Sequence, residues 1–224
     1  MANELQAFRR IVLSGLLVTA LLACDQSPSI STGTTATADG NSGNGLRTAR
    51  PQSEPRQLTD FALVDHQQRD FNRAALINHW TLMFFGFTRC PDICPPTLSQ
   101  LSALQQRMTQ AGEQPPQLIF VTVDPEVDQP QVLADYLSSF DGDIIGVTGD
   151  SRQIGALTTQ LGIFNRIRPG AGHDHHDRHH TDVDHSGTIL MIDPQARHVA
   201  SFIQLPESPA DLEYDLRQLM QPES

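Results

Sequence analysis

The segment from Leu82 to Pro96 places the strongest constraint on how this chain folds. It begins with an apolar run, Leu82 to Phe87, that is typical of a strand buried on both faces. Two cysteines follow, Cys90 and Cys94, with three residues between them, and then a pair of prolines. Proline is favoured in the first turn of a helix, where its missing N–H would form no intrahelical bond. The pattern predicts a buried strand, a short loop that carries two thiols, and a helix.

Strands and helices alternate over the rest of residues 57–224. The apolar patterns predict strands at Phe61–Val64, Asp70–Phe71, Trp80–Phe87, Leu118–Val123, Ile144–Val147, Thr188–Ile192 and His198–Ile203. They predict helices at Thr97–Ala111, Val132–Phe140, Ser151–Leu161 and Leu212–Leu219. The last two strands flank Asp193-Pro-Gln-Ala and form an antiparallel hairpin. This order predicts a three-layer α/β fold of thioredoxin type, with a central mixed sheet.

The first 23 residues have the features of a signal peptide. Arg9 and Arg10 precede an apolar core that runs from Ile11 to Ala23, too short for a transmembrane helix of about 20 residues. The core ends in Leu-Leu-Ala-Cys24, which resembles the bacterial lipobox, so we expect Cys24 to be lipidated. An uncleaved anchor and an ordinary cleavage site are the alternatives. Asp25 resembles an inner-membrane retention signal, and we expect a lipoprotein of the inner (cytoplasmic) membrane that faces the periplasm.

Residues 24–56 follow as the lipidated cysteine and a predicted flexible linker. The segment consists mainly of Ser, Thr, Gly, Ala, Asn and Pro, and it has too little apolar surface to offset the chain entropy lost on folding. A flexible chain of this length has a reach of roughly 30 Å. We therefore expect a folded domain at residues 57–224 that stays close to the membrane.

Charge and cysteine content exclude two classes of protein. The formal net charge of −11 argues against a nucleic-acid partner and against direct adhesion to an anionic membrane surface. Of the three cysteines, only Cys90 and Cys94 lie in the predicted domain, so there is no framework of disulfides. The core must come from ordinary apolar burial.

The predicted position of Cys90 and Cys94 favours reactive sulfur. The N-terminus of a helix stabilises a thiolate and Arg89 adds positive charge, whereas Asp92 opposes both. A thiolate is the nucleophile of disulfide exchange and also a preferred ligand of Cu(I). Two inert core cysteines are the remaining alternative, although the end of a strand before a proline turn is a poor place for them.

The spacing of the cysteines bears on this choice. Thioredoxin-like reductases have two residues between their thiols, which keeps the thiols within easy reach of a disulfide, and this chain has three. The longer loop can still close a disulfide, but it also lets two sulfurs spread around a metal ion. A metal ion held in this way would need a further donor from elsewhere in the chain.

Three motifs together resemble the Sco/SenC family of copper proteins. They are Gly86-Phe-Thr-Arg-Cys-Pro-Asp-Ile-Cys-Pro95, then Val123-Asp-Pro-Glu-Val-Asp128 with Pro130, and Val183-Asp-His-Ser186 with Asp193-Pro194. The resemblance covers nearly all of residues 57–221 in the same order. It implies a thioredoxin-like fold and one copper ion, Cu(I) or Cu(II), bound by Cys90, Cys94 and His185. Asp124 matches an acidic position of the family near the site, where it would support the ligands or face a partner.

The resemblance also implies a function in assembly of the dinuclear copper centre of cytochrome c oxidase. We expect a metallochaperone rather than an enzyme, with an upstream copper donor and the copper-receiving subunit of the oxidase as partners. The alternative is a thiol–disulfide oxidoreductase that reduces the copper-ligand cysteines of the target. A peroxidase is a weaker interpretation because its reactive cysteine belongs to another motif, and a metal buffer would rest on the histidine tract described next.

The chain departs from the family pattern in three places. Val127 stands where many relatives have arginine, and Ala196 replaces the usual glycine of the hairpin. Between Gly170 and Asp184 relatives often have a segment with tyrosine, whereas this chain has histidines interleaved with aspartates. The histidines of this tract are His173, His175, His176, His179 and His180. Such a tract favours Cu(II), Zn(II) or Ni(II), so it is either an auxiliary metal site or a polar insertion without selected affinity.

Overall fold

The computed structural model describes residues 45–163, 166–167, 183–184, 187–203 and 205–221. The strands are β1 Arg50–Gln57, β2 Ala62–Asp65, β3 Asp70–Asn72, β4 Thr81–Gly86, β5 Gln117–Thr122, β6 Ile144–Thr148, β7 Arg166–Ile167, β8 Val183–Asp184, β9 Ile189–Ile192 and β10 Arg197–Phe202. The helices are the 3₁₀ turn η1 Arg73–Leu76 and the α-helices α1 Cys94–Gln110, α2 Pro130–Leu137, α3 Ser151–Leu161 and α4 Pro209–Leu219.

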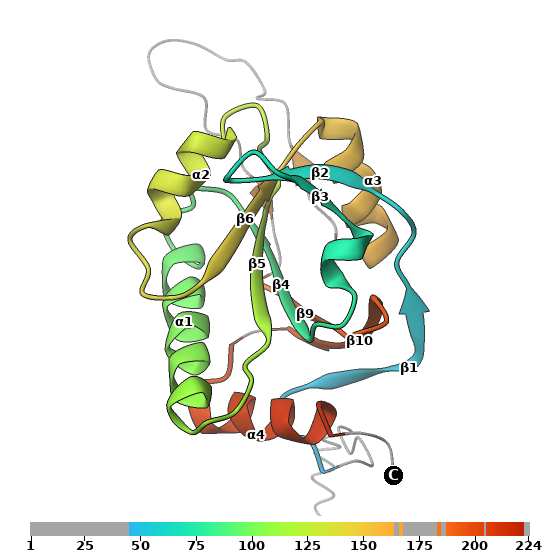
Figure 1. Ribbon diagram of the computed structural model, residues 1–224, viewed down its shortest axis with the longest axis vertical. Helices are drawn as coiled ribbons and strands as arrows, with labels where there is room; N and C mark the ends of the chain where they lie inside the picture. The colour runs from blue at the N-terminus through green and yellow to red at the C-terminus, as the bar shows by residue number, and fades with distance from the viewer. Residues whose placement is uncertain (1–44, 164–165, 168–182, 185–186, 204, 222–224) are drawn as a thin grey trace, which may run out of the picture. The chain divides into compact units, whose positions relative to one another are not determined.

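Eight strands form one mixed sheet, in the order β1-β10-β9-β4-β5-β6-β2-β3 (Figure 1). Strand β4 lies parallel to β5, and β5 lies parallel to β6, as expected where helices connect the strands. Strand β9 runs antiparallel to β4 on its other side. Strands β7 and β8 form a separate antiparallel pair. The predicted mixed sheet is confirmed.

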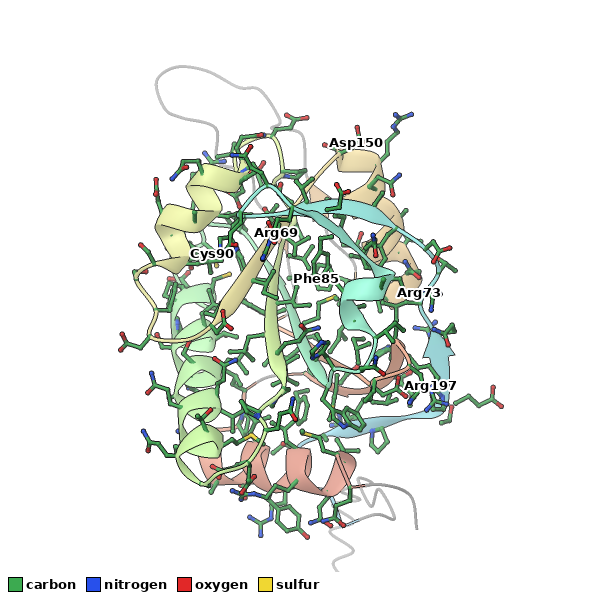
Figure 2. The ribbon with its side chains drawn as sticks, viewed as in Figure 1. Arg69, Arg73, Phe85, Cys90, Asp150 and Arg197 are labelled. Atoms are coloured by element: carbon green, nitrogen blue, oxygen red, sulfur yellow. The ribbon has the colours of Figure 1, made fainter. Side chains whose placement is uncertain are left out.

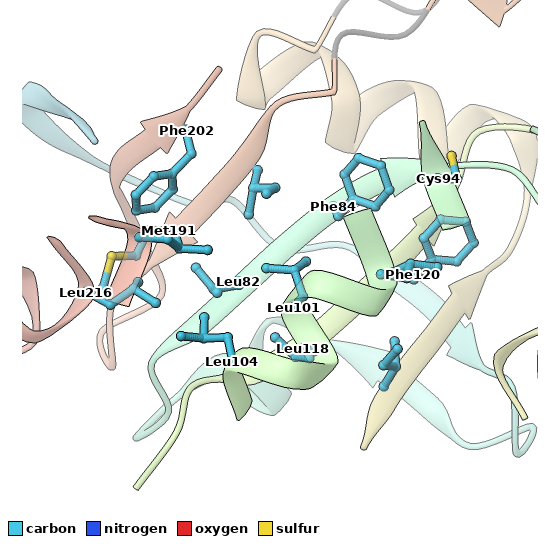
Figure 3. Close-up of a cluster of buried hydrophobic side chains, with 14 of the residues drawn as sticks. Leu82, Phe84, Cys94, Leu101, Leu104, Leu118, Phe120, Met191, Phe202 and Leu216 are labelled. Atoms are coloured by element: carbon cyan, nitrogen blue, oxygen red, sulfur yellow. The ribbon is translucent and has the colours of Figure 1, made fainter. Parts of the chain in front are cut away.

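Two apolar cores cover the two faces of this sheet. One core joins the sheet to α1, α2 and α4, and Figure 3 shows Leu82 and Phe84 of β4 facing Leu101 and Leu104 of α1 within it. The other core joins the opposite face to η1 and α3. Successive side chains of β4 alternate between the two cores, and all six of its residues are buried. The predicted three-layer arrangement is therefore confirmed, with β4 at its centre.

Three predicted helices differ in extent from the observed ones, and of these α4 begins at Pro209 rather than Leu212. Helix α1 begins at Cys94 rather than Thr97, because Pro95 and Pro96 occupy its first turn. Helix α2 ends at Leu137, and Val132 on it is 39% exposed, so Val132 does not belong to the buried face on which we expected it.

The predicted boundary between linker and domain at residue 57 is wrong, because the folded part starts earlier. Residues 50–57 form β1, an edge strand paired with β10. Its side chains are mostly exposed, so its sequence shows no apolar alternation, and Pro51 and Pro55 suit only an edge. The pairing is between backbones, which composition does not reveal. The rest of the predicted linker, residues 25–44, lies outside the described residues.

A buried carboxylate joins the residues before β1 to α4. The side chain of Asp215 accepts hydrogen bonds from the backbone N–H groups of Arg47, Thr48 and Ala49, at 2.7–2.8 Å, and from the Thr48 hydroxyl at 2.8 Å. Arg47 also pairs with Asp211 at 2.6 Å and lies over the ring of Tyr214. Residues 47–49 are thus fixed on α4 at one end of the molecule.

The predicted signal peptide and the lipidation site Cys24 also lie outside the described residues. Within the described part of the chain, no helix has the length and apolar character needed to cross a bilayer.

We expect Asp215→Ala to lower the free energy of unfolding by about 3 kcal/mol, because the charged acceptor of four hydrogen bonds is lost. Burial opposes ionisation of Asp215, but the N–H groups around it outweigh burial and lower the pKa of its carboxyl from the usual 3.8. This contribution is therefore present above pH 3.8 and is lost as the pH falls through the lower folded-state pKa.

Urea unfolding of the wild type and the variant between pH 3 and 7 measures both effects. Asp211→Ala, which removes only the exposed pair with Arg47, is the matched control and should change stability by less than about 1 kcal/mol. Equal stability of Asp215→Ala and wild type at pH 7 would contradict the role of this carboxylate.

Candidate metal centre

Cys90 and Cys94 lie where β4 ends and α1 begins, as the labels of Cys90 in Figure 2 and of Cys94 in Figure 3 show. The N–H of Cys90 donates to the carbonyl of Phe87 at 3.1 Å, which closes a tight turn directly after the strand. Cys94 is the first residue of α1. Both side chains are buried, with 5% of Cys90 and none of Cys94 exposed, and neither is in a disulfide. The predicted position of the two thiols is confirmed.

A glycine at the end of β4 makes room for the sulfur of Cys94. A Cβ atom on Gly86 would lie 2.7 Å from Cys94 Sγ and 2.7 Å from Cε2 of Phe120 on β5. Neither neighbour has open space into which it could move, because both are buried in the same core. Only glycine permits this approach of strand and sulfur.

Burial is the main influence on the charge of Cys94. Burial, then a hydrogen bond with the Cys90 side chain, raise the pKa of the Cys94 thiol far above its ordinary value, and the backbone of Phe87 opposes them only in part. The expectation that the helix N-terminus favours a thiolate is therefore wrong for Cys94 in the metal-free protein. Loss of water around the sulfur outweighs the field of the helix here.

The charge of Arg89 is also offset. Its guanidinium donates to Oδ2 of Asp124 at 2.7 Å, and this pair lies at the surface beside the cysteine loop. The sequence placed Asp124 near the site, and the structure puts it in contact with the loop through Arg89. Asp92, between the two cysteines, is exposed to solvent.

A second carboxylate, that of Asp128, anchors the same loop from inside. It accepts hydrogen bonds from the N–H of Thr88 at 2.9 Å, the hydroxyl of Thr88 at 2.6 Å and the hydroxyl of Thr122 at 2.7 Å. The N–H of Asp128 donates to the carbonyl of Asp124 at 2.9 Å, so the turn after β5 holds the carboxylate in place. The end of β5, this turn and the cysteine loop form one hydrogen-bonded unit.

The hydroxyl of Tyr136 lies buried without a hydrogen-bond partner among the described residues. Its ring packs on Phe120, with ring centroids 5.9 Å apart. Burial, followed by the charges of Cys94, Cys90 and Asp128, raises the pKa of Tyr136, so the phenol stays protonated. From the sequence, this residue is predicted only to lie on the apolar face of the helix at Val132–Phe140.

Sequence reasoning did not single out Gly86, Asp128 and Tyr136, although the structure groups them around Cys94. Gly86 and Asp128 stand inside quoted motifs, so a glycine at a strand end and an aspartate four residues after Asp124 were available signals. Tyr136 carried no such signal, because a tyrosine on an amphipathic helix is ordinary core.

The chain returns to the cysteine loop just after His185. A Cβ atom on Gly187 would lie 3.5 Å from Cδ1 of Ile93, the residue before Cys94. Two residues later, Ile189 begins β9 and pairs with Phe84 of β4. Residues 187–189 therefore pass beside the thiol pair.

His185 itself and the histidine tract from His173 to His180 lie outside the described residues. Within the described ranges, no group of three or more His, Cys, Asp or Glu side chains is arranged to hold a metal ion. The two thiols would need a further donor, and the ligand set of Cys90, Cys94 and His185 stays a prediction.

The model of the SCO1/SenC family matches residues 49–221, which is most of the chain. This chain therefore belongs to the SCO1/SenC family, and the predicted family is confirmed. The match begins close to β1, in agreement with the corrected start of the domain.

Particular relatives agree with this assignment. The human mitochondrial SCO2 homolog is 38% identical over 136 residues, 60% of this chain and 49% of that protein, so the chain spans about half the length of the mitochondrial relatives it matches. Copper-bound ScoI of Bradyrhizobium japonicum is 31% identical with a TM-score of 0.61, over 72% of this chain and 98% of that one. Apo Sco1 of Thermus thermophilus is 27% identical with a TM-score of 0.64, over 77% and 96%. The thioredoxin-like fold of the Sco proteins is thus confirmed for this chain.

The described residues fit a copper ion in two respects. Cys90 and Cys94 supply two soft sulfur donors, the kind that copper in its Cu(I) state prefers. Both sulfurs are shielded from water, and a cation between them would stabilise the two thiolates that burial otherwise disfavours.

We expect Gly86→Ala to displace the Cys94 sulfur, because the new methyl group would overlap both this sulfur and the ring of Phe120. The free energy of unfolding should fall by about 1–3 kcal/mol, and copper binding should weaken. Thermal unfolding and copper titration measure the two effects.

Gly155→Ala is the matched control. A Cβ atom at Gly155, in the middle of α3, would meet no atom within 4 Å, so this variant should be neutral or more stable by about 0.5–1 kcal/mol. If the two variants bound copper equally well, the close packing at Gly86 would have no part in the site.

Proposed function

We propose that this chain is a membrane-tethered copper metallochaperone, which binds copper through Cys90, Cys94 and His185 and delivers it to the dinuclear copper centre of cytochrome c oxidase. Copper is the metal that the relatives support, since the Bradyrhizobium ScoI structure contains it. A Sco protein of the same fold, BsSco, is described as a member of a family of cytochrome c oxidase assembly proteins. BsSco is only 18% identical, so the assembly function is carried by family membership.

The observation that carries the proposal is the convergence of two distant segments at the end of β4. The thiols of Cys90 and Cys94 lie there, and Gly187 lies against Ile93 between them. His185 precedes Gly187 by only two residues, so it is the histidine closest in sequence to the segment that reaches Ile93. Two sulfurs and one imidazole satisfy Cu(I), which is content with two or three donors of this kind.

Delivery follows from the chemistry of these donors. Cys90 and Cys94 lose their protons as they bind copper and recover them when a partner's cysteines and histidines take over the ion. Ligand exchange needs access from outside, and the loop provides it because Ile93, the residue before Cys94, is 36% exposed. An upstream copper donor would use the same face.

In this proposal the N-terminal region determines where in the cell the protein lies. Residues 1–23 act as the signal peptide, Cys24 carries the lipid, and a linker leads to the copper-binding domain, whose described part begins at residue 45. The protein is then a lipoprotein of the inner membrane that faces the periplasm. The anchor and its partners would share one membrane, which raises their effective concentration.

A thiol–disulfide oxidoreductase is the second candidate, and the contact between the two thiols favours it. Cys90 and Cys94 are joined by a side-chain hydrogen bond, so the two thiols are neighbours and could form a disulfide with each other. The raised pKa of Cys94 makes it a poor attacking nucleophile, so Cys90 would have to attack the partner's disulfide and Cys94 would resolve the mixed disulfide.

The two functions differ in their need for His185. With Cys24→Ser as background, which leaves Cys90 and Cys94 as the only cysteines, the full chain should bind copper with a Cu–S absorption band. Cys90→Ser and Cys94→Ser should abolish the band, and His185→Ala should weaken copper binding at least tenfold. His79→Ala, at an exposed histidine before β4, is the control and should bind as the parent does. Unchanged copper affinity in His185→Ala, together with strong disulfide reductase activity, would favour the reductase.

The histidine tract is expected to act as an auxiliary Cu(II) site that loads the thiol site. Replacing His173, His175, His176, His179 and His180 with asparagine should reduce the uptake of Cu(II) by the full chain from more than one equivalent to one. Loading of the Cu–S band at limiting copper should become slower. Uptake of a single equivalent by the unmodified chain would show that the tract is only a polar insertion.

A further inference from the structure

We infer that Asp128 is a positioning residue for the copper centre: it fixes the loop that carries Cys90, and its charge favours Cu(II) over Cu(I) at the thiol pair. The inference rests on the proposed function of Cys90 and Cys94.

Asp128 is an unusual side chain to hold a loop of this kind, because it is fully buried and no cation of the described residues pairs with it. None of its side chain is exposed. Both of its oxygens accept hydrogen bonds, Oδ2 from the N–H of Thr88 and the hydroxyl of Thr122, and Oδ1 from the hydroxyl of Thr88. Among the ion pairs of the described residues none includes Asp128, and Arg89, which follows Thr88 in the loop, pairs with Asp124. A buried charge that is held by neutral donors is screened less than a charge in water, so its field extends further into its surroundings.

The hydrogen bonds of Asp128 reach Cys90 through Thr88. Thr88 lies inside the turn that the N–H of Cys90 closes on the carbonyl of Phe87. Two of the three donors to Asp128 come from Thr88, its backbone and its hydroxyl, so both the place and the rotation of this residue are fixed. These bonds restrain the turn and with it the direction in which the Cys90 side chain leaves it.

The charge of Asp128 acts differently on the two oxidation states of copper, because the net charge of the whole site differs between them. With a neutral imidazole as third donor, the site carries a net charge of −1 with Cu(I) and zero with Cu(II). A fixed negative charge nearby disfavours the first state relative to the second. Asp128 and the two cysteines share a neighbour, Tyr136, whose pKa is raised by burial first and then by contributions from Cys94, Cys90 and Asp128.

If Asp128 acted only by holding the loop in place, loss of its charge would not change the preference between Cu(I) and Cu(II). Variants of this chain can separate the structural effect from the effect of the charge. Asp128→Asn removes the charge but can keep three hydrogen bonds, because the amide oxygen accepts two and the amide N–H₂ can donate to the Thr88 hydroxyl. Thr122→Val keeps the charge and removes two hydrogen bonds outside the loop, the one that the Thr122 hydroxyl donates to Asp128 and the one that it accepts from the N–H of Asp124. Thr88→Ala keeps the charge and loosens the loop, and Thr88→Ser restores the hydroxyl.

The test measures the dissociation constants of Cu(I) and Cu(II) separately, by competition with chelators, and the energy of the Cu–S absorption band. It uses the full chain with Cys24→Ser. Asp128→Asn should increase the affinity for Cu(I), relative to the affinity for Cu(II), by roughly tenfold, which corresponds to a change in reduction potential of about 59 mV for one electron. Thr122→Val should leave this ratio unchanged even where it lowers stability. Thr88→Ala should shift the Cu–S band, and Thr88→Ser should restore it.

The outcomes that overturn the inference are distinct from failure of the proposed function. An unchanged affinity ratio in Asp128→Asn would remove the electrostatic role, and an unchanged band in Thr88→Ala would remove the positioning role. If Asp128→Asn did not fold, Thr88→Ala and Thr88→Ser would still test the positioning. A parent protein without a Cu–S band, or with a band that Cys90→Ser leaves intact, would instead overturn the proposed function and this inference with it.

Discussion

The contact between the Cys94 sulfur and the backbone of Gly86 joins the core of this protein to its chemistry. Strand β4 is buried on both faces, so its last residue has a fixed position, and the sulfur packs directly against it and against Phe120. Helix α1 must then begin at Cys94, which sets the direction in which its apolar face covers the sheet. The accuracy with which the thiols are placed therefore comes from the packing of the whole central layer and not from the loop alone.

The same burial sets the electrostatic condition of the site. Cys94 is a neutral thiol in the metal-free protein because its surroundings exclude water, and Asp128 adds a buried negative charge to them. Arg89 could have offset this charge, but it points to the surface, where it holds Asp124. A site of this kind is stabilised by a cation and disfavours bare thiolates, which agrees with the function of holding a metal ion and protecting it from solvent.

Much of the fold could be predicted because the pattern of apolar residues in the sequence indicates which of them are buried. The run from Leu82 to Phe87 predicts a central strand, and the helix from Ser151 ends at Gly162 as the sequence indicates, because glycine readily adopts the left-handed conformation found there. Strand β1 could not be predicted, since an exposed edge strand held by backbone pairing shows no apolar pattern. The thiol pair was predictable from spacing and motif, whereas the neutral state of Cys94 and the role of Asp128 depend on burial and on contacts between segments distant in sequence.

The hydrogen bonds between residues 47–49 and Asp215 have a mechanical consequence. They attach this segment to α4, which packs beside the C-terminal end of α1 through the Arg107–Glu213 and Arg217–Glu113 pairs. Helix α1 is 17 residues long, so about 25 Å separates this end of the molecule from Cys94 (Figure 1). A force on the chain before residue 47 therefore enters the domain at α4. The thiol pair lies the length of α1 away from that point, so such a force reaches it only through the packed helix and sheet.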